Sequence, residues 1–307
     1  HDKRNLRANL THHGISTNLG TQSRPNDHIL FAQSLHFAYD RTIILPLNLV
    51  MSLNHDTKQP KSGARFYLCR KIREGETLVE LPKDIANHAK SALRLKEGAL
   101  FYLFDGTGGE YLAKLVIASN GSLMAEIINF SDVNPESELK ISLVQSVMSN
   151  DKMNWLIQKA TELGVNEINI FKAERSALKI DAQMLEKKKM HWHKVAIAAC
   201  EQSGRTKIPS IKTFLSLSNY LENSLSTNAK ETRIILSPSG SNTPQNIPPG
   251  QEKLTITIGP EGGFTDHELF MAKSNAFLDM RLGPRTLRAE TAGISLIAIS
   301  QALFGDL

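Results

Sequence analysis

The segment Leu254–Phe270, LTITIGPEGGFTDHELF, has the residue order of a ligand-binding loop. Alternating apolar and threonine residues up to Ile258 predict a strand. The pattern Thr265–Glu268 is a capping box, which predicts a helix start at Thr265. Between them lie the loop residues Gly259, Pro260, Glu261, Gly262 and Gly263. Open α/β sheets hold ligands where a strand passes into a helix N-terminus, but this spacing matches neither GxGxxG nor GxxxxGK[ST].

Two more predicted strands run into loops of the same style. They are Ile234–Gly240, IILSPSG, and Met280–Thr291, MRLGPRTLRAET. Small residues let the backbone approach a ligand closely and read its polar edges. One such loop would be weak evidence, because strand-to-helix turns need glycine anyway. Three loops of this kind, all at strand carboxyl ends, predict a shared pocket.

The elements around these loops indicate two domains. From residue 141 to 307 strands and helices alternate, which predicts an α/β domain with a parallel sheet. Residues 64–140 contain five short apolar runs and one helical patch, as in a small β-barrel, and residues 134–140 read as a linker. Residues 1–63 show no sustained period, so we expect a disordered or non-native extension, with Met51 as a plausible start.

Composition narrows the class of protein. The chain has 307 residues, 41% hydrophobic and 22% charged, as in an ordinary globular protein. The formal charge of +5 mildly favours an anionic partner such as nucleic acid. Cys69 and Cys200 offer no disulfide framework, and no segment is long and apolar enough for a membrane span, so we expect a cytoplasmic protein. His191 and His193, two apart on a helix, face different sides, and we expect no metal site.

Four motifs together resemble one known family. They are WLIQKATELGV, EQSGR, IGPEGGF and LGPRTLRAETA. In this order they resemble the 16S rRNA uridine-N3 methyltransferases, a branch of the SPOUT class of S-adenosylmethionine-dependent RNA methyltransferases. HAKSALRLKEGALFYLFDGTGGEYLA resembles the PUA-like barrel of that family. The resemblance covers roughly residues 64–307 and implies methylation of uridine N3 in 16S rRNA of the 30S subunit.

The resemblance also implies a fold, a cofactor site and an assembly. The C-terminal part of the sheet would form a deep trefoil knot, an exception to the rule that chains are unknotted. A homodimer would form through the knot region. S-adenosylmethionine carries no phosphate, which fits the missing phosphate-loop signature. The implied cofactor residues are Leu236, Ser237, Pro238, Gly259, Pro260, Glu261, Gly262, Gly263, Leu282, Gly283 and Leu287.

Methylation of N3 requires a base, or stabilisation of negative charge on the base as the proton leaves. The candidate donors are Arg205, Arg285 and Arg288. The candidate bases are Glu201, Glu261 and Glu290, although each has a structural alternative as a helix cap or an arginine partner. In the first domain, Arg65, Arg94 and Lys96 are candidates for contacts with RNA phosphates.

Two other functions remain open at this stage. One is a SPOUT-class tRNA ribose 2′-O-methyltransferase, in which the third loop would differ from LGPRTLRAET. The other is a non-catalytic RNA-binding ribosome-assembly protein. The intact glycine loops argue against the latter, because a degenerate site should have lost its glycines.

Overall fold

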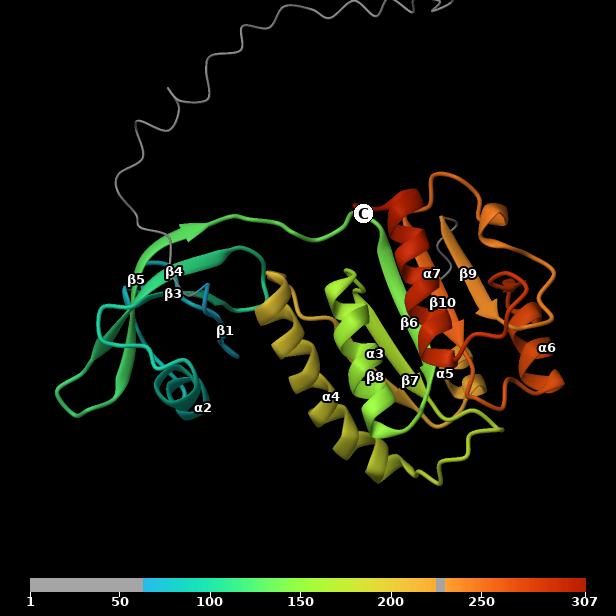
Figure 1. The fold of residues 1–307 in the computed structure, drawn as a ribbon, viewed down its shortest axis with the longest axis horizontal. Helices are drawn as coiled ribbons and strands as arrows, with labels where there is room; N and C mark the ends of the chain where they lie inside the picture. Colours follow the sequence, from blue (N-terminus) through green and yellow to red (C-terminus); the bar gives the residue numbers. More distant parts are fainter. Residues whose placement is uncertain (1–62, 225–229) are drawn as a thin grey trace, which may run out of the picture. The chain divides into compact units, whose positions relative to one another are not determined.

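The computed structural model describes residues 63–224 and 230–307 of the chain (Figure 1). The extension expected over residues 1–63 therefore lies almost entirely outside the described residues. The described chain forms a five-stranded mixed sheet followed by a six-stranded parallel sheet. None of its helices is long and apolar enough to cross a membrane.

The first sheet contains the five strands that the sequence predicts between residues 64 and 140. They are β1 (Arg65–Tyr67), β2 (Leu78–Glu80), β3 (Leu100–Phe104), β4 (Glu110–Ile117) and β5 (Leu123–Ser131). The order is β1-β3-β4-β5-β2, and only β1 and β3 are parallel. No pairing joins β1 to β2 within the described residues, so the sheet is open between these two strands. The helical patch is α2 (Lys83–Asn87), which continues as a π-helical turn, η1 (His88–Ala92).

The second sheet has six parallel strands in the order β11-β9-β10-β6-β7-β8. They are β6 (Lys140–Ser146), β7 (Glu167–Phe171), β8 (Ser210–Phe214), β9 (Glu231–Leu236), β10 (Lys253–Ile258) and β11 (Phe277–Met280). Six of the seven residues of β6 are buried, because a central parallel strand is covered on both faces.

Helices cover both faces of this sheet. They are α3 (Asn150–Glu162), α4 (Ala182–Ser203), α5 (Leu217–Ser224), α6 (Asp266–Ser274) and α7 (Ala289–Phe304), with a short 3₁₀ helix η2 (Pro244–Asn246). Figure 1 shows α3, α4 and α7 side by side over one face, where they enclose the larger core. On the other face, α5 contacts α6, β7 and β8, and α6 packs on β11.

The sequence predicted most of these elements and missed two. Gly164 ends the α3 segment in the left-handed conformation, with φ of 81°, as expected for a C-terminal stop. The sequence patterns did not single out β8 or α5. β8 is a five-residue edge strand with two exposed residues, Ser210 and Lys212, so its apolar signal is weak.

Candidate active site at the carboxyl ends of three strands

Three loops meet at one edge of the parallel sheet, as the sequence predicts. Strand β9 pairs in parallel with both β10 and β11, and Leu236 is in register with Ile258 and Met280. The loops that follow these residues therefore leave the sheet side by side. They surround a cavity of about 670 Å³, which we call the three-loop cavity.

All the residues that the resemblance implies for the cofactor line this cavity. They are Leu236, Ser237, Pro238, Gly259, Pro260, Glu261, Gly262, Gly263, Leu282, Gly283 and Leu287. The structure brings them together, while their role in binding remains a prediction.

The second loop is held by a tight turn and a helix cap. The Gly263 amide donates to the Pro260 carbonyl at 2.9 Å, with Gly263 at φ of 70°. Thr265 then caps α6 as predicted: its hydroxyl accepts from the Glu268 amide at 3.1 Å, and the Glu268 carboxylate accepts from the Thr265 amide at 2.9 Å. Glu268 is 1% exposed and also accepts from the Glu174 amide at 3.0 Å. It therefore ties the loop to the segment after β7.

The first loop folds back against β11. A Cβ at Gly240 would lie 2.4 Å from the carbonyl carbon of Met280, so only glycine permits this approach. The Ser237 amide donates to the Met280 carbonyl at 2.9 Å, and the Asn242 amide donates to the Asp279 carbonyl at 3.0 Å. These bonds fix the first and third loops relative to each other.

The third loop presents backbone donors. No described residue accepts a hydrogen bond from the amides of Leu282, Gly283 and Leu287. Gly283 has φ of 71°, and a Cβ there would meet no atom within 4 Å. Exposed amides next to apolar side chains suit a ligand that is bound through hydrogen bonds to the backbone.

Two of the predicted catalytic arginines lie at this cavity. Arg285 and Arg288 both line it and both are exposed. Arg288 is the N-cap residue of α7, and its side chain makes no capping hydrogen bond. Neither guanidinium forms an ion pair or hydrogen bond with a described residue, so the structural alternative of an Arg288–Glu290 pair is not seen.

Lys152 is a component that the sequence analysis missed. It lies in the first turn of α3 and pairs with Glu261, and its Nζ lies 3.9 Å from the Glu290 carboxylate. The hydrogen bond with Glu261 raises the pKa of Lys152 above its ordinary value, with a smaller contribution from Glu290. Strand β6 lies beside β10, so the helix that follows β6 begins at the same edge of the sheet as the second loop. This adjacency is the signal from which Lys152 could have been predicted.

The structure places the other two predicted catalytic residues, Glu201 and Arg205, away from the three-loop cavity. The Glu201 carboxylate accepts from the Tyr67 amide at 2.9 Å, and burial raises the pKa of Glu201. Arg205 is 4% exposed. In this chain the EQSGR motif therefore contacts β1 and does not line the three-loop cavity, and its assignment to catalysis stays a prediction.

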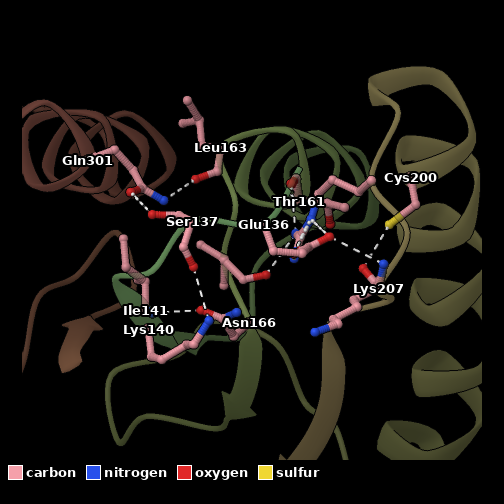
Figure 2. Close-up of polar contacts among 12 residues, drawn as sticks. Glu136, Ser137, Lys140, Ile141, Thr161, Leu163, Asn166, Cys200, Lys207 and Gln301 are labelled. Carbon is pink, nitrogen blue, oxygen red and sulfur yellow. Dashed lines mark hydrogen bonds and ion pairs between the residues drawn. The ribbon is translucent and has the colours of Figure 1, made fainter. Parts of the chain in front are cut away.

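Arg205 instead holds the linker through Glu136, and Figure 2 shows Glu136 between Thr161 and Lys207. Its guanidinium donates to Glu136 at 2.6 Å and to the Thr161 and Val165 carbonyls at 2.9 and 2.8 Å. The Lys207 amide also donates to Glu136, at 3.2 Å. The buried arginine thus has its charge and its donors matched by protein groups, as a structural ion pair requires.

The candidate RNA contacts of the first domain separate into two kinds. Arg65 pairs with Glu110, donates to the Gly204 carbonyl at 3.1 Å and lies over the Phe104 ring, so it is already engaged. Arg94 and Lys96 are exposed, and neither has a side-chain partner among the described residues. Among those residues no group of three or more His, Cys, Asp or Glu could hold a metal ion.

Comparisons with known proteins agree with this fold and pocket. Residues 135–301 match the model of an RNA methyltransferase domain, and residues 81–128 match an RNA methyltransferase PUA domain. These matches define an RNA methyltransferase that carries a PUA domain.

Individual relatives refine the class. The ribosomal RNA small subunit methyltransferase E of Buchnera aphidicola subsp. Schizaphis graminum is 34% identical over 75% of this chain and 92% of that protein. The Bacillus subtilis protein of the same name is 30% identical over 77% and 96%. A crystal structure of the Neisseria gonorrhoeae protein, bound to S-adenosyl methionine, superposes with a TM-score of 0.72 at 33% identity, over 80% of this chain and 99% of that one. This chain belongs to the ribosomal RNA small subunit methyltransferase E family.

Proposed function

We propose that this chain transfers the methyl group of S-adenosylmethionine to N3 of a uridine in 16S rRNA of the small ribosomal subunit. The observation that carries the proposal is the three-loop cavity with two arginines at its lining that have no partner among the described residues. The S-adenosyl methionine bound to the Neisseria gonorrhoeae relative supports the choice of cofactor.

The residues present fit this cofactor. A cavity of about 670 Å³ lies within the range of small-molecule sites, roughly 300–1,000 Å³. Leu236, Leu282 and Leu287 supply apolar walls for an adenine, and the unengaged amides of the third loop supply donors for its polar edge. No phosphate-binding loop is needed, since the cofactor carries no phosphate.

Methyl transfer to N3 requires the protein to position the two reactants and to stabilise the negative charge that develops. The bound cofactor supplies an electrophilic methyl group. As the N3 proton leaves, negative charge develops on the uracil oxygens, and guanidinium groups of Arg285 and Arg288 would donate to that charge. Glu261 and Glu290 both face Lys152. We therefore assign these two carboxylates to holding the second loop and α7 together, and name no general base.

The same proposal includes the assembly. A deep trefoil knot of the three loops and a homodimer through that region would complete the site, as the resemblance implies. Domain limits of 64–140 and 141–307 are supported by family matches at residues 81–128 and 135–301. A 16S rRNA substrate within the 30S subunit places the enzyme in the cytoplasm.

The test is methylation of 30S subunits from a strain that lacks the modification, with labelled S-adenosylmethionine and mass spectrometry of the product nucleosides. We expect 3-methyluridine in 16S rRNA and little transfer to naked rRNA. A ribose 2′-O-methylated product, or transfer to tRNA instead, would favour the related tRNA enzyme. RNA binding without cofactor binding in calorimetry would favour a non-catalytic assembly protein.

A further inference from the structure

A second cavity lies far along the sheet from the methyl-transfer site. It has a volume of about 610 Å³ and opens between the β3–β4 loop, α4 and the start of β8. Strand β8 is the edge strand opposite β11. Ser210 begins β8, so the cavity lies at the amino end of that strand, whereas the three loops leave carboxyl ends. We call it the junction cavity.

One stripe of α4 forms a wall of the junction cavity. Glu186, Lys189, Met190 and His193 all line it, and their spacing of three, four and seven residues places them on one helix face. His191 points elsewhere, because its ring bonds Asn154 at 2.9 Å. Part of the basic segment Lys187–Lys194 therefore lines a hollow.

The opposite wall combines an aromatic ring with apolar residues. Tyr67, Ile208 and Pro209 line the cavity. A Cβ at Gly106 would lie 3.3 Å from the Tyr67 ring, so the loop backbone packs directly against that ring. Met190, on the α4 wall of the same cavity, is 65% exposed. A flat apolar ligand group could therefore stack here without displacing any buried side chain.

The acidic groups of the cavity are already engaged. Asp105 accepts hydrogen bonds from the Ile72 amide at 3.2 Å and from the Thr107 amide and hydroxyl at 3.0 and 2.6 Å. Glu186 accepts from the Thr213 hydroxyl and pairs with Lys189 at 3.0 Å, which lowers the pKa of Glu186 and keeps it ionised.

Two basic side chains remain available, His193 in the lining of the cavity and Lys207 beside it. The Lys207 side chain runs along the β3–β4 loop, with its Cε 3.5 Å from the Cβ position of Gly108. Its ammonium group has no partner among the described residues. The His193 ring is exposed and likewise has no described partner. An ammonium group beside the junction cavity and an imidazole in its lining are thus free of described partners, and the ammonium group suits a phosphate.

We infer that the junction cavity binds a single-stranded segment of the RNA substrate, with one base stacked between Tyr67 and Met190 and a flanking phosphate at Lys207. Aromatic stacking platforms beside basic side chains are the general means of holding unpaired nucleotides. This inference rests on the proposed function, since it takes rRNA as the substrate. Because the cavity is remote from the three loops, it would contribute to RNA affinity and leave the chemical step alone.

The experiment compares Met190→Glu and Lys207→Ala with a matched control, Met184→Glu. Met184 lies on the same helix, is 46% exposed and does not line the cavity. Both glutamate variants add the same charge at an exposed methionine, so folding should be equally tolerant. We expect Met190→Glu to raise KM for 30S subunits about tenfold, consistent with the loss of one stacked base. kcat and cofactor affinity should not change, and Met184→Glu should behave as wild type.

A binding assay makes the result independent of methylation. The probe is a short fluorescein-labelled oligouridylate, titrated without cofactor. Lys207→Ala should reduce the slope of log affinity against log salt concentration by the amount that corresponds to the loss of about one phosphate contact. Unchanged affinity in both variants would overturn the inference, as would equal loss in Met184→Glu or tighter binding of a duplex of the same length. Absence of methylation by wild type, with oligouridylate binding intact, would refute the proposed function and not the cavity.

Discussion

Gly283 lies in the third loop at φ of 71°, where a Cβ would meet no atom within 4 Å. The cost of Gly283→Ala is therefore backbone strain alone, about 1–2 kcal/mol for an L-residue in the left-handed region. Because the loop would relieve this strain by turning its amides, we expect cofactor affinity to fall at least tenfold, measured by calorimetry.

Gly75→Ala is the control for this substitution. Gly75 has φ of 77°, equally open surroundings and a position in the first domain, away from the three-loop cavity. It should lower the free energy of unfolding by a similar amount while cofactor affinity stays at the wild-type value. Equal cofactor affinity in both variants would show that the third loop is not part of the site.

Arg288 tests the proposed role in catalysis. It is exposed at the three-loop cavity and forms no ion pair with a described residue. If it stabilises charge that develops only during transfer, Arg288→Ala should lower single-turnover methylation by roughly a hundredfold, as removal of one preorganised donor does. Cofactor affinity and melting temperature should barely move.

Arg288→Lys distinguishes geometry from charge. A lysine keeps the charge but loses the planar fork of donors, so it should recover only part of the rate. Full recovery would mean that any cation suffices, and a wild-type rate in Arg288→Ala would remove the residue from the mechanism.

Two helix caps of the same kind permit a test at the scale of elements. The Thr265 side chain accepts from the Glu268 amide at 3.1 Å, and the Asp181 side chain accepts from the Met184 amide at 2.8 Å. Replacing either by alanine should lower the free energy of unfolding by about 1 kcal/mol. Only α6 begins at the second loop of the cavity, so only Thr265→Ala should also weaken cofactor binding. Identical cofactor affinities in the two variants would show that the Thr265 cap does not contribute to the cofactor site.

The sequence predicted the elements that carry strong local signals. The capping box at Thr265 and the glycine stop at Gly164 each appear where the residue types demand them. The convergence of the three loops followed from parallel strands having their carboxyl ends at one edge. The place of the cavity was therefore predictable from the strands, whereas the individual cofactor residues were implied by the resemblance.

Other parts of the site depend on contacts that no local pattern encodes. Lys152 meets Glu261, 109 residues further along the chain, only because β6 pairs with β10. Arg205 was assigned to catalysis from its motif, yet its partner Glu136 lies in a segment that read as a plain linker. The burial of Arg205 and Glu136 is a property of the tertiary fold. The motif alone therefore could not show that Arg205 pairs with the linker.

At the scale of the whole molecule, the linker is a packed element. Glu136 and Ser137 are 8% and 3% exposed. The Ser137 hydroxyl bonds Gln301 of α7 at 2.8 Å, and Gln301 donates to the Leu163 carbonyl at 2.9 Å, as Figure 2 shows. The segment between the two sheets is thus bonded to α7 and to the residues that follow α4. The stability of the catalytic domain should therefore depend on residues that precede its first strand.

Glu136→Gln tests this dependence, with Glu126→Gln as control. The first change leaves the Arg205 guanidinium buried without a counter-ion, and removing one partner of a buried pair costs about 3–5 kcal/mol. Glu126 pairs with Lys114 at the surface, where both side chains are more than 40% exposed, so its loss should cost less than about 1 kcal/mol. Denaturant unfolding measures both. Equal midpoints in the two variants would show that the linker contributes no more than a surface pair.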